Sequence, residues 1–281
     1  EIEEIIFLLR KNNYQRIAFI DLAPTESMIN LVERLKNQGY KIVLYLDHHF
    51  HPELDADLKL NVEKLKNELG EEVKITSREE SPSCICLVEE QMWKKKEIDV
   101  VFFHPDLDGF LAFLKGAGIC YDEMEADAEI LEGVSKKRKL SKRGQIIANA
   151  LRILVPHPAF DPFLCLKKKA EILQKLTNWI WSGKKDIIED LISEMKERIR
   201  EAIKITNEIL DSAVFYPKEK VIFCDLIKYI KEGKPVFLPY LKKLINEKFG
   251  KCLICLATIG YLGEEISIQK PKAWKIDLRN F

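Results

Sequence analysis

The sequence predicts an α/β fold in which a parallel sheet covered by helices is followed by a helical segment and a smaller α/β unit. Two observations lead to this fold class. Short runs rich in β-branched and aromatic residues alternate with amphipathic stretches through the first half of the chain. Glycine follows two of these stretches, at Gly39 and Gly70, as expected just past the end of a helix. Such alternation favours parallel strands, because each crossover lays a helix on the sheet.

The elements of the first half follow from this alternation. Each predicted strand is an apolar run bounded by polar or turn residues, and each predicted helix has apolar residues at intervals of three and four. The strands are expected at 16–21, 41–46, 73–76 and 98–103, and the helices at 27–39, 53–70 and 82–96.

The second half begins with helices and returns to strands. From about residue 124 to 212 the pattern is helical, with a break at the proline-containing stretch VPHPAFDP (155–162). Strands follow around one predicted helix at 237–250. These strands are expected at 213–216, 220–226, 251–259 and 264–269. The predicted domains are therefore 1–155, a helical linker at 156–212, and a C-terminal α/β domain at 213–281.

The composition limits the classes of function. The chain has 281 residues, 47% of them hydrophobic, with 45 basic and 45 acidic residues. Because the charges balance, a site for a polyanion must be a local patch. The seven cysteines suggest no disulfide framework, and no apolar run reaches about 18 residues, so a cytoplasmic protein that does not contact membranes is expected. Cys252 and Cys255 form a CxxC in a predicted strand, where side chains alternate between faces, which favours buried cysteines over a metal site.

Residues that commonly bind metals follow three of the four strands predicted in the first half. Because the carboxyl ends of parallel strands meet at one edge of a sheet, we expect these side chains to converge on one crevice. Charged groups beside buried strands need a compensating partner. Mixed imidazole and carboxylate donors suit a pair of divalent ions, with Mn²⁺ favoured and Mg²⁺ as the alternative. The residues are Asp21, Asp47, His48, His49, His104, Asp106 and Asp108.

Each group of residues has a simpler explanation when it is taken alone. Asp21 could cap the next helix, Asp47-His48-His49 could be a turn with solvated imidazoles, and HPDLDG (104–109) could be a capped turn. These explanations do not account for the position of all three groups directly after apolar strands. Two metal ions about 3.5–4 Å apart at this edge would hold a phosphoryl group and activate a bridging water.

With these motifs the sequence resembles the DHH phosphoesterase superfamily, which includes RecJ-like exonucleases, oligoribonucleases and manganese-dependent pyrophosphatases. The resemblance rests on DHH at 47–49, HxDxDG at 104–109 and the lone strand-end Asp21, and it covers most of the chain. PSCICL (82–87) lies where the family has a Ser/Thr-rich helix start, and residues 213–281 look like the family's C-terminal substrate-binding domain. The motif order is circularly permuted relative to the usual order of the family, and it is similar to that of the archaeal Hef-associated nucleases.

The resemblance implies how the metal ions would be held. Asp21 would bridge both ions. His104 and Asp106 would hold one ion, and His48 and Asp108 would hold the other.

The resemblance also implies roles for neighbouring residues. His49 would contact the scissile phosphate, and Asp47 would orient the neighbouring imidazole. Gly109 would let the backbone turn tightly into the next helix. For a further ligand aspartate of the family, the segment 121–133 offers Asp122 and Asp127. We select Asp127 because an apolar helix-like run follows it, with a surface N-cap as the alternative.

Two basic regions are candidates for substrate binding. The run SKKRKLSKRG (135–144) would attract nucleic acid in a salt-dependent way, with a solvated loop as the alternative. In the C-terminal domain the family often has an arginine after a strand, where this chain offers a lysine, and its glycine-rich GGGH-type motif is not found in 213–281. The expected substrate-binding residues are Lys136, Lys137, Arg138 and Lys270.

We therefore predict a manganese-dependent, two-metal phosphoesterase that acts as a 3′→5′ exonuclease on single-stranded DNA or RNA and releases mononucleotides. A phosphatase, pyrophosphatase or oligoribonuclease of the same family is one alternative, and a non-catalytic nucleic-acid-binding scaffold is another. The expected partners are single-stranded nucleic acid and, through the resemblance, a repair helicase or nuclease such as Hef. Apolar helix faces around 171–181 are compatible with a homo-oligomer.

Overall fold

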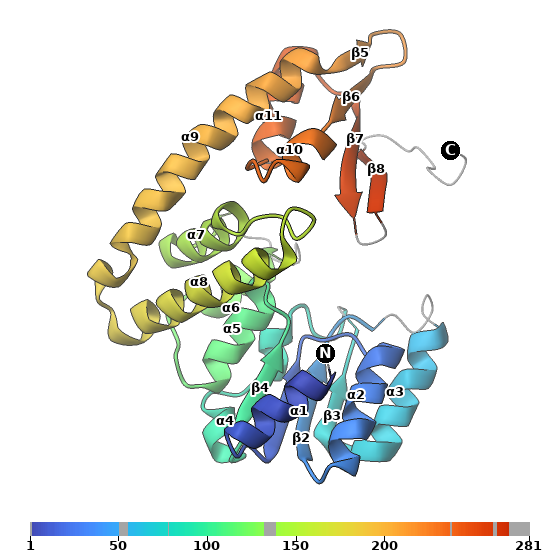
Figure 1. Cartoon of the computed structure of the whole chain (residues 1–281), viewed down its shortest axis with the longest axis vertical. Helices are drawn as coiled ribbons and strands as arrows, with labels where there is room; N and C mark the ends of the chain where they lie inside the picture. Colours follow the sequence, from blue (N-terminus) through green and yellow to red (C-terminus); the bar gives the residue numbers. More distant parts are fainter. Residues whose placement is uncertain are drawn as a thin grey trace. The chain divides into compact units, whose positions relative to one another are not determined.

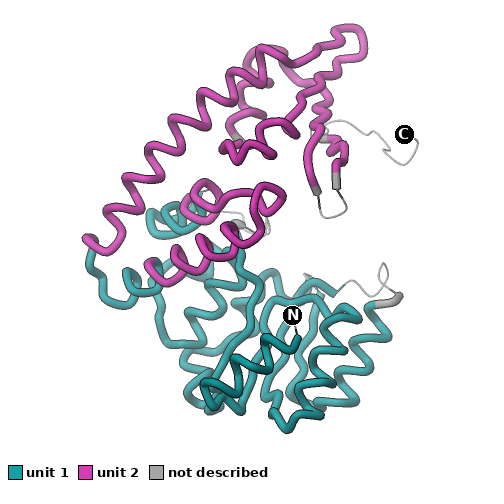
Figure 2. Tube along the Cα trace, in the orientation of Figure 1, with its two compact units in different colours: residues 1–148, 176–184 teal, residues 149–175, 185–281 magenta. Residues whose placement is uncertain are grey.

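The chain divides into two compact units (Figure 2). The computed structural model describes residues 2–50, 56–77, 79–131, 139–236, 238–260 and 263–269. The first unit comprises residues 1–148 and 176–184, and the second comprises 149–175 and 185–281. This division differs from the predicted one, because the segment 156–212 contributes to both units instead of forming a separate linker.

The first unit is built on a four-stranded parallel sheet, the fold class that the sequence predicts (Figure 1). The spatial order β3-β2-β1-β4 places the second and fourth strands on opposite sides of the first. In such sheets a crevice forms at the carboxyl ends of the strands where the order reverses, here between β1 and β4. The strands are β1 (Arg16–Ile20), β2 (Lys41–Asp47), β3 (Val73–Ile75) and β4 (Val100–Phe103).

Every residue of Ile17–Ile20 in β1 is fully buried, which shows that both faces of this sheet are covered. On one face, Ile17 and Phe19 belong to a core with residues of three helices. The helix after β4 contacts β1 and β4. The three helices are α1 (Ile2–Lys11), α2 (Glu26–Asn37) and α3 (Ala56–Leu69), and the helix after β4 is α5 (Leu107–Gly116).

The segment 82–96 does not form the single helix that its pattern predicts. A 3₁₀ turn, η2 (Cys84–Leu87), and a short helix, α4 (Met92–Lys95), are separated by residues outside any helix. Gln91 has a φ of 58°, in the left-handed region that does not continue a right-handed helix. Ile85 and Met92 are nevertheless buried, so packing with the rest of the unit determines the path of this segment. The other short elements of the unit are η1 (Gly70–Glu72), α6 (Met124–Leu131) and α7 (Lys142–Asn149).

The second unit contains a mixed sheet in the order β5-β6-β7-β8. Its two central strands are parallel and the two outer pairs are antiparallel. All four strands agree with the predicted runs, and Ile205 and Ile209 of the long helix α9 pack into the core beside the sheet. The helix α10 is absent from the prediction, since five residues are too few to show a helical period. The elements are β5 (Val214–Tyr216), β6 (Val221–Asp225), β7 (Leu253–Gly260), β8 (Gly263–Gln269), α9 (Glu189–Ser212), α10 (Ile227–Lys231) and α11 (Leu238–Phe249).

The predicted break at 155–162 separates a π-helical segment, η3 (Ala150–Leu154), from the helix α8 (Pro162–Ser182). Proline suits the first position of α8, and Asp161 Oδ1 accepts a hydrogen bond from the Leu164 amide at 2.9 Å, which caps the helix. A 3₁₀ turn, η4 (Lys185–Ile188), follows α8. None of the described helices combines the length and the hydropathy that a membrane span requires.

Candidate metal centre

Asp21 directly follows β1 and holds its side chain in the interior of the first unit. Its amide donates to the Leu46 carbonyl at 2.8 Å, which ties the residue to the end of β2. Its φ is 55°, a left-handed conformation that aspartate adopts more readily than most residues. Such unusual backbone conformations cluster at functional sites.

The DHH stretch begins at the last residue of β2. Asp47 and His48 are buried, whereas the side chain of His49 is 32% exposed. Asp47 Oδ1 lies 3.1 Å from His49 Nδ1, and its second oxygen accepts the His49 amide at 3.1 Å. The buried carboxylate therefore fixes the orientation of the His49 ring.

The HPDLDG stretch turns from β4 into α5. Asp106 is the N-cap of α5, and its side chain accepts the Gly109 amide at 3.0 Å. Asp108 lies in the first turn of α5 and is buried. A Cβ atom at Gly109 would lie 2.3 Å from the His104 carbonyl oxygen and 3.0 Å from Asp21 Oδ2. Glycine is required here because the helix start approaches β4 and Asp21 so closely.

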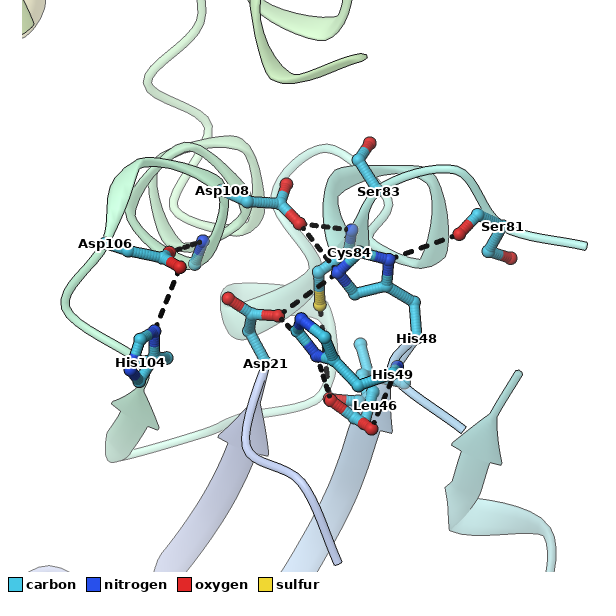
Figure 3. A network of polar contacts seen from close by, with 12 residues as sticks. Asp21, Leu46, His48, His49, Ser81, Ser83, Cys84, His104, Asp106 and Asp108 are labelled. Carbon is cyan, nitrogen blue, oxygen red and sulfur yellow. Dashed lines mark hydrogen bonds and ion pairs between the residues drawn. The ribbon is translucent and has the colours of Figure 1, made fainter. Parts of the chain in front are cut away.

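These three stretches bring their side chains together around Asp21 (Figure 3). Asp21 belongs to two groups of potential metal ligands, one with His48 and His49 and one with His104 and Asp106. Within each group the ligand atoms lie within 4.8 Å of one another. Asp21 is thus shared by both groups of side chains that could hold a metal ion.

The ring of His48 is oriented by a backbone carbonyl. His48 Nδ1 lies 3.3 Å from the Ser81 carbonyl oxygen, which can only accept a hydrogen bond, so Nδ1 carries a proton. Nε2 faces two carboxylates, at 3.0 Å from Asp108 Oδ2 and 3.4 Å from Asp21 Oδ1. In the neutral ring, Nε2 would present a lone pair to these oxygens. Only a proton or a metal cation at this position makes the arrangement favourable.

Several polar atoms at the centre of the cluster are buried without a hydrogen bond. They are both carboxylate oxygens of Asp21, Nε2 of His48 and Oδ1 of Asp108. The contacts of Nε2 are within the distance of an ion pair, but they lack the geometry of a hydrogen bond. Buried carboxylates without donors cost several kcal/mol unless a cation compensates them. These donors therefore fit divalent metal ions.

Exposure changes from the floor of the cluster to its rim. Asp21, His48 and Asp108 are almost fully buried, whereas the side chains of His104 and Asp106 are 47% and 44% exposed. His104 Nδ1 lies 3.0 Å from Asp106 Oδ2. The cluster thus has a buried floor of two carboxylates and an imidazole, and a rim that solvent and solutes can reach.

The pKa values of the group reflect this burial. Burial raises the pKa of Asp21 to about 6, and the carboxylates of Asp106 and Asp108 add to the effect against the opposing contact with His48. Burial alone would lower the pKa of His48, but Asp108 and Asp21 raise it to about 10. The hydrogen bond to Asp47 likewise raises the pKa of His49. Without metal, the cluster retains positive charge on the histidines that metal binding would displace.

One grouping differs from the one that the resemblance implies. The structure places His49, in addition to His48, within mutual ligand distance of Asp21, whereas Asp108 is in neither group. Asp108 instead contacts His48 Nε2, and its Oδ2 accepts the Cys84 amide at 2.7 Å. Neither the Ser81 carbonyl nor the Cys84 amide was predicted to take part. The only indication in the sequence was that Cys84 lies within the PSCICL stretch (82–87) and that Ser81 directly precedes it.

Asp127 has a different environment from the one expected of a metal ligand. Its carboxylate accepts hydrogen bonds from the Tyr121 hydroxyl at 2.9 Å, the Ser141 amide at 2.7 Å and the Ser141 hydroxyl at 2.5 Å. Ser141 Oγ in turn accepts the Gly144 amide at the start of α7. Asp127 is buried and belongs to neither group of potential ligands among the described residues. The structure therefore joins Asp127 to the start of α7 instead of to the cluster.

Cysteine chemistry has little support in the described part of the chain. Cys84 lies beside the cluster, but burial and the carboxylates of Asp21 and Asp108 raise the pKa of its thiol well above the usual value. A thiol that stays protonated is a poor nucleophile. Cys252 is buried, as predicted, and Cys255 is half-buried; neither belongs to a potential ligand group there.

The predicted substrate-binding residues Lys136, Lys137, Arg138 and Lys270 lie outside the described residues. In comparisons with known proteins, the chain matches no family model and no curated protein.

Proposed function

We propose that this protein is a metal-dependent phosphoesterase of the DHH type. The observation that carries the proposal is the central position of Asp21, a buried carboxylate without hydrogen-bond donors that is shared by two groups of histidine and aspartate ligands. Asp21 would contact both metal ions. His104 and Asp106 would hold one ion, and His48, with His49 or Asp108, would hold the other.

A pair of divalent ions, with Mn²⁺ favoured over Mg²⁺, would supply an activated water and neutralise charge on the phosphoryl oxygens. The residues of the chain prepare the site for this chemistry. The Ser81 carbonyl keeps the proton of His48 on Nδ1 and so leaves Nε2 as the ligand atom. Asp47 holds the ring of His49 and raises its pKa, and in the protonated state this partly exposed ring can donate from Nε2 to a phosphate oxygen.

The substrate class follows from the open rim and from the family resemblance. We infer a 3′→5′ exonuclease that acts on single-stranded DNA or RNA and releases mononucleotides. The exposed side chains of His104 and Asp106 leave the cluster accessible to a long substrate. No covalent intermediate is required, in keeping with the protonated state of the nearby Cys84 thiol.

The test is a digest of single-stranded DNA and RNA, labelled at either end, in manganese buffer. A 3′→5′ exonuclease converts a 3′ label into mononucleotide at once and shortens a 5′-labelled strand stepwise. A pyrophosphatase would leave both strands intact and hydrolyse pyrophosphate instead. Manganese binding without cleavage of any of these substrates would favour the non-catalytic scaffold.

A further inference from the structure

A cavity of about 200 Å³ lies within the second unit. It is partly open to solvent and is lined by η3 and the residues after it, by α9, by α10 with the residues that flank it, by the start of α11 and by β7. The described residues that line it all belong to the second unit, and none of them is a candidate ligand of the metal centre. At about 30 Å³ per water molecule in the liquid, this volume corresponds to roughly seven water molecules, which suits a small organic molecule.

The lining of this cavity is basic. Arg152, Arg198 and Lys234 line it from three different segments, and His157 adds an imidazole. No aspartate or glutamate is among the described residues that line it. Cations gathered from separate elements around one hollow, without a carboxylate inside it, favour an anionic ligand.

The cationic groups have unused hydrogen-bonding capacity. Arg152 has no hydrogen bond or ion pair with any residue that the structure describes. Arg198 pairs with Glu201 on its own helix at 2.7 Å, and Lys234 pairs with Glu232 at 2.6 Å. An arginine has five N–H donors and a lysine has three, so each of these side chains can still donate to a ligand. The pairs are partly exposed and satisfy only part of this capacity.

His157 also presents a donor. The Ala159 amide donates to His157 Nδ1 at 3.2 Å, so in the neutral ring the proton lies on Nε2. Among the described residues no group accepts a hydrogen bond from this Nε2. The break between η3 and α8, which the sequence shows only as a proline-rich interruption, thus adds an imidazole with an N–H donor to the residues that line the cavity.

Apart from Thr258, the remaining described lining residues are apolar or glycine. Ile153, Ala202 and Leu226 line the cavity and are buried. The Phe160 ring packs on Gly233, where a Cβ atom would lie 2.9 Å from the ring and where φ is +67°. This contact holds the loop after η3 against the loop after α10. The cavity thus combines apolar walls with cationic donors from three segments, a combination typical of ligand sites.

We propose that this cavity binds a small organic phosphate monoester. The doubly charged phosphate would lie against Arg152, Arg198 and Lys234, because arginine forks match the geometry of phosphate oxygens. The organic group would lie against the aliphatic walls. The π-helical turn that positions Arg152 is a rare conformation that occurs frequently at functional sites. The proposal is independent of the metal centre and of its proposed activity.

Binding is tested by titration calorimetry of the full chain with phenyl phosphate, in buffer that contains EDTA so that no metal ion contributes. Phenol and inorganic phosphate are titrated in parallel, since the combined site predicts tighter binding of phenyl phosphate than of either part. A 5′-phosphorylated trinucleotide shows whether the monoester is better recognised when free or at the end of a strand. Failure of both monoesters to bind would overturn the proposal.

Variants locate the binding. Arg152→Met is expected to weaken phenyl phosphate binding roughly tenfold through loss of a charged hydrogen bond. The control Arg200→Met removes an exposed arginine of α9 that does not line the cavity, and it should leave affinity unchanged. Ala202→Leu should fill the cavity and block binding, with circular dichroism as the check of folding. Equal affinity of the Arg152→Met protein and the native protein would place the anion elsewhere and refute the assignment.

Discussion

Replacing Asp21 by asparagine should stabilise the metal-free protein at pH 8 and abolish its stabilisation by Mn²⁺. Both oxygens of Asp21 are buried without a hydrogen bond, and Asp106 and Asp108 are nearby carboxylates. Burial and these charges raise the pKa of Asp21 from 3.8 to about 6 in the folded protein. The ionised side chain is therefore unfavourable in the metal-free protein, even with the protonated His48 beside it.

The sign and size of the effect follow from proton linkage. Because the folded state holds this proton more tightly than the unfolded state, the stabilising contribution is complete below about pH 4 and is lost as the pH rises through about 6. A shift of about two units corresponds to about 3 kcal/mol. Asparagine avoids this cost at pH 8 but weakens the contact with His48. We expect a net gain of about 1–2 kcal/mol, or roughly 2–8 °C in Tm for a unit of this size.

The assay is thermal and urea denaturation, followed by circular dichroism, of metal-free protein at pH 5 and pH 8. At pH 5 the native Asp21 is already mostly protonated, so the advantage of the variant should largely disappear. Mn²⁺ should then raise the Tm of the native protein and leave that of Asp21→Asn unchanged, because a ligand stabilises only the state that binds it.

Asp99→Asn is a control with the opposite sign. The exposed Asp99 carboxylate accepts the Gln15 and Arg16 amides at 2.8 Å each, and these hydrogen bonds lower its pKa. Its stabilising contribution is present above its unfolded pKa and is lost as the pH falls, so this variant should be less stable at pH 8. The reasoning fails if Asp21→Asn is less stable than the native protein at pH 8 without metal, or if Mn²⁺ stabilises both proteins equally.

Three further predictions concern single side chains. Asp106→Asn keeps an N-cap for the Gly109 amide, so the metal-free Tm should change little, while manganese-dependent cleavage of a labelled oligonucleotide should fall at least about 100-fold; a normal rate would exclude Asp106 as a ligand. Asp127→Asn weakens a set of three hydrogen bonds, so urea denaturation should show that the free energy of unfolding falls by about 1–3 kcal/mol. The Mn²⁺ affinity measured by calorimetry should not change. A loss of Mn²⁺ affinity with unchanged stability would instead assign Asp127 to the metal. Gly116→Ala would place a Cβ atom 2.0 Å from the Trp93 ring and should destabilise the first unit by about 1–3 kcal/mol in the same assay; a neutral result would mean that Trp93 moves freely.

The sequence was sufficient to predict those features that depend on short stretches of residues. Strands β1, β2 and β4 are short apolar runs that end at a polar residue, so the positions of Asp21, Asp47 and His104 at strand ends could be predicted. The expectation that these strand ends converge required only parallel pairing, which the alternation with helices implies. The proximity of Asp21 to His48 and Asp106 agrees with that expectation.

The local sequence pattern did not predict the structure where contacts with distant segments determine it. The segment 82–96 has a helical pattern, yet it breaks at Gln91 as it buries Ile85 and Met92 and brings the Cys84 amide to Asp108. Asp127 lies inside α6 and not before it, and its hydrogen bonds go to Tyr121 and Ser141. The hydrogen-bond partners of a buried carboxylate depend on which donors the folded chain brings near it.

The sequence by itself determined the α/β class, the strands and the identity of the groups that gather at their ends, because hydrophobic period and residue type are properties of short stretches. Only the tertiary structure decided the order β3-β2-β1-β4, the shared position of Asp21 between two ligand groups and the basic cavity of the second unit. The physical reason is that these features arise from residues far apart in the chain, whose contacts are fixed by burial of the whole core and not by any local preference.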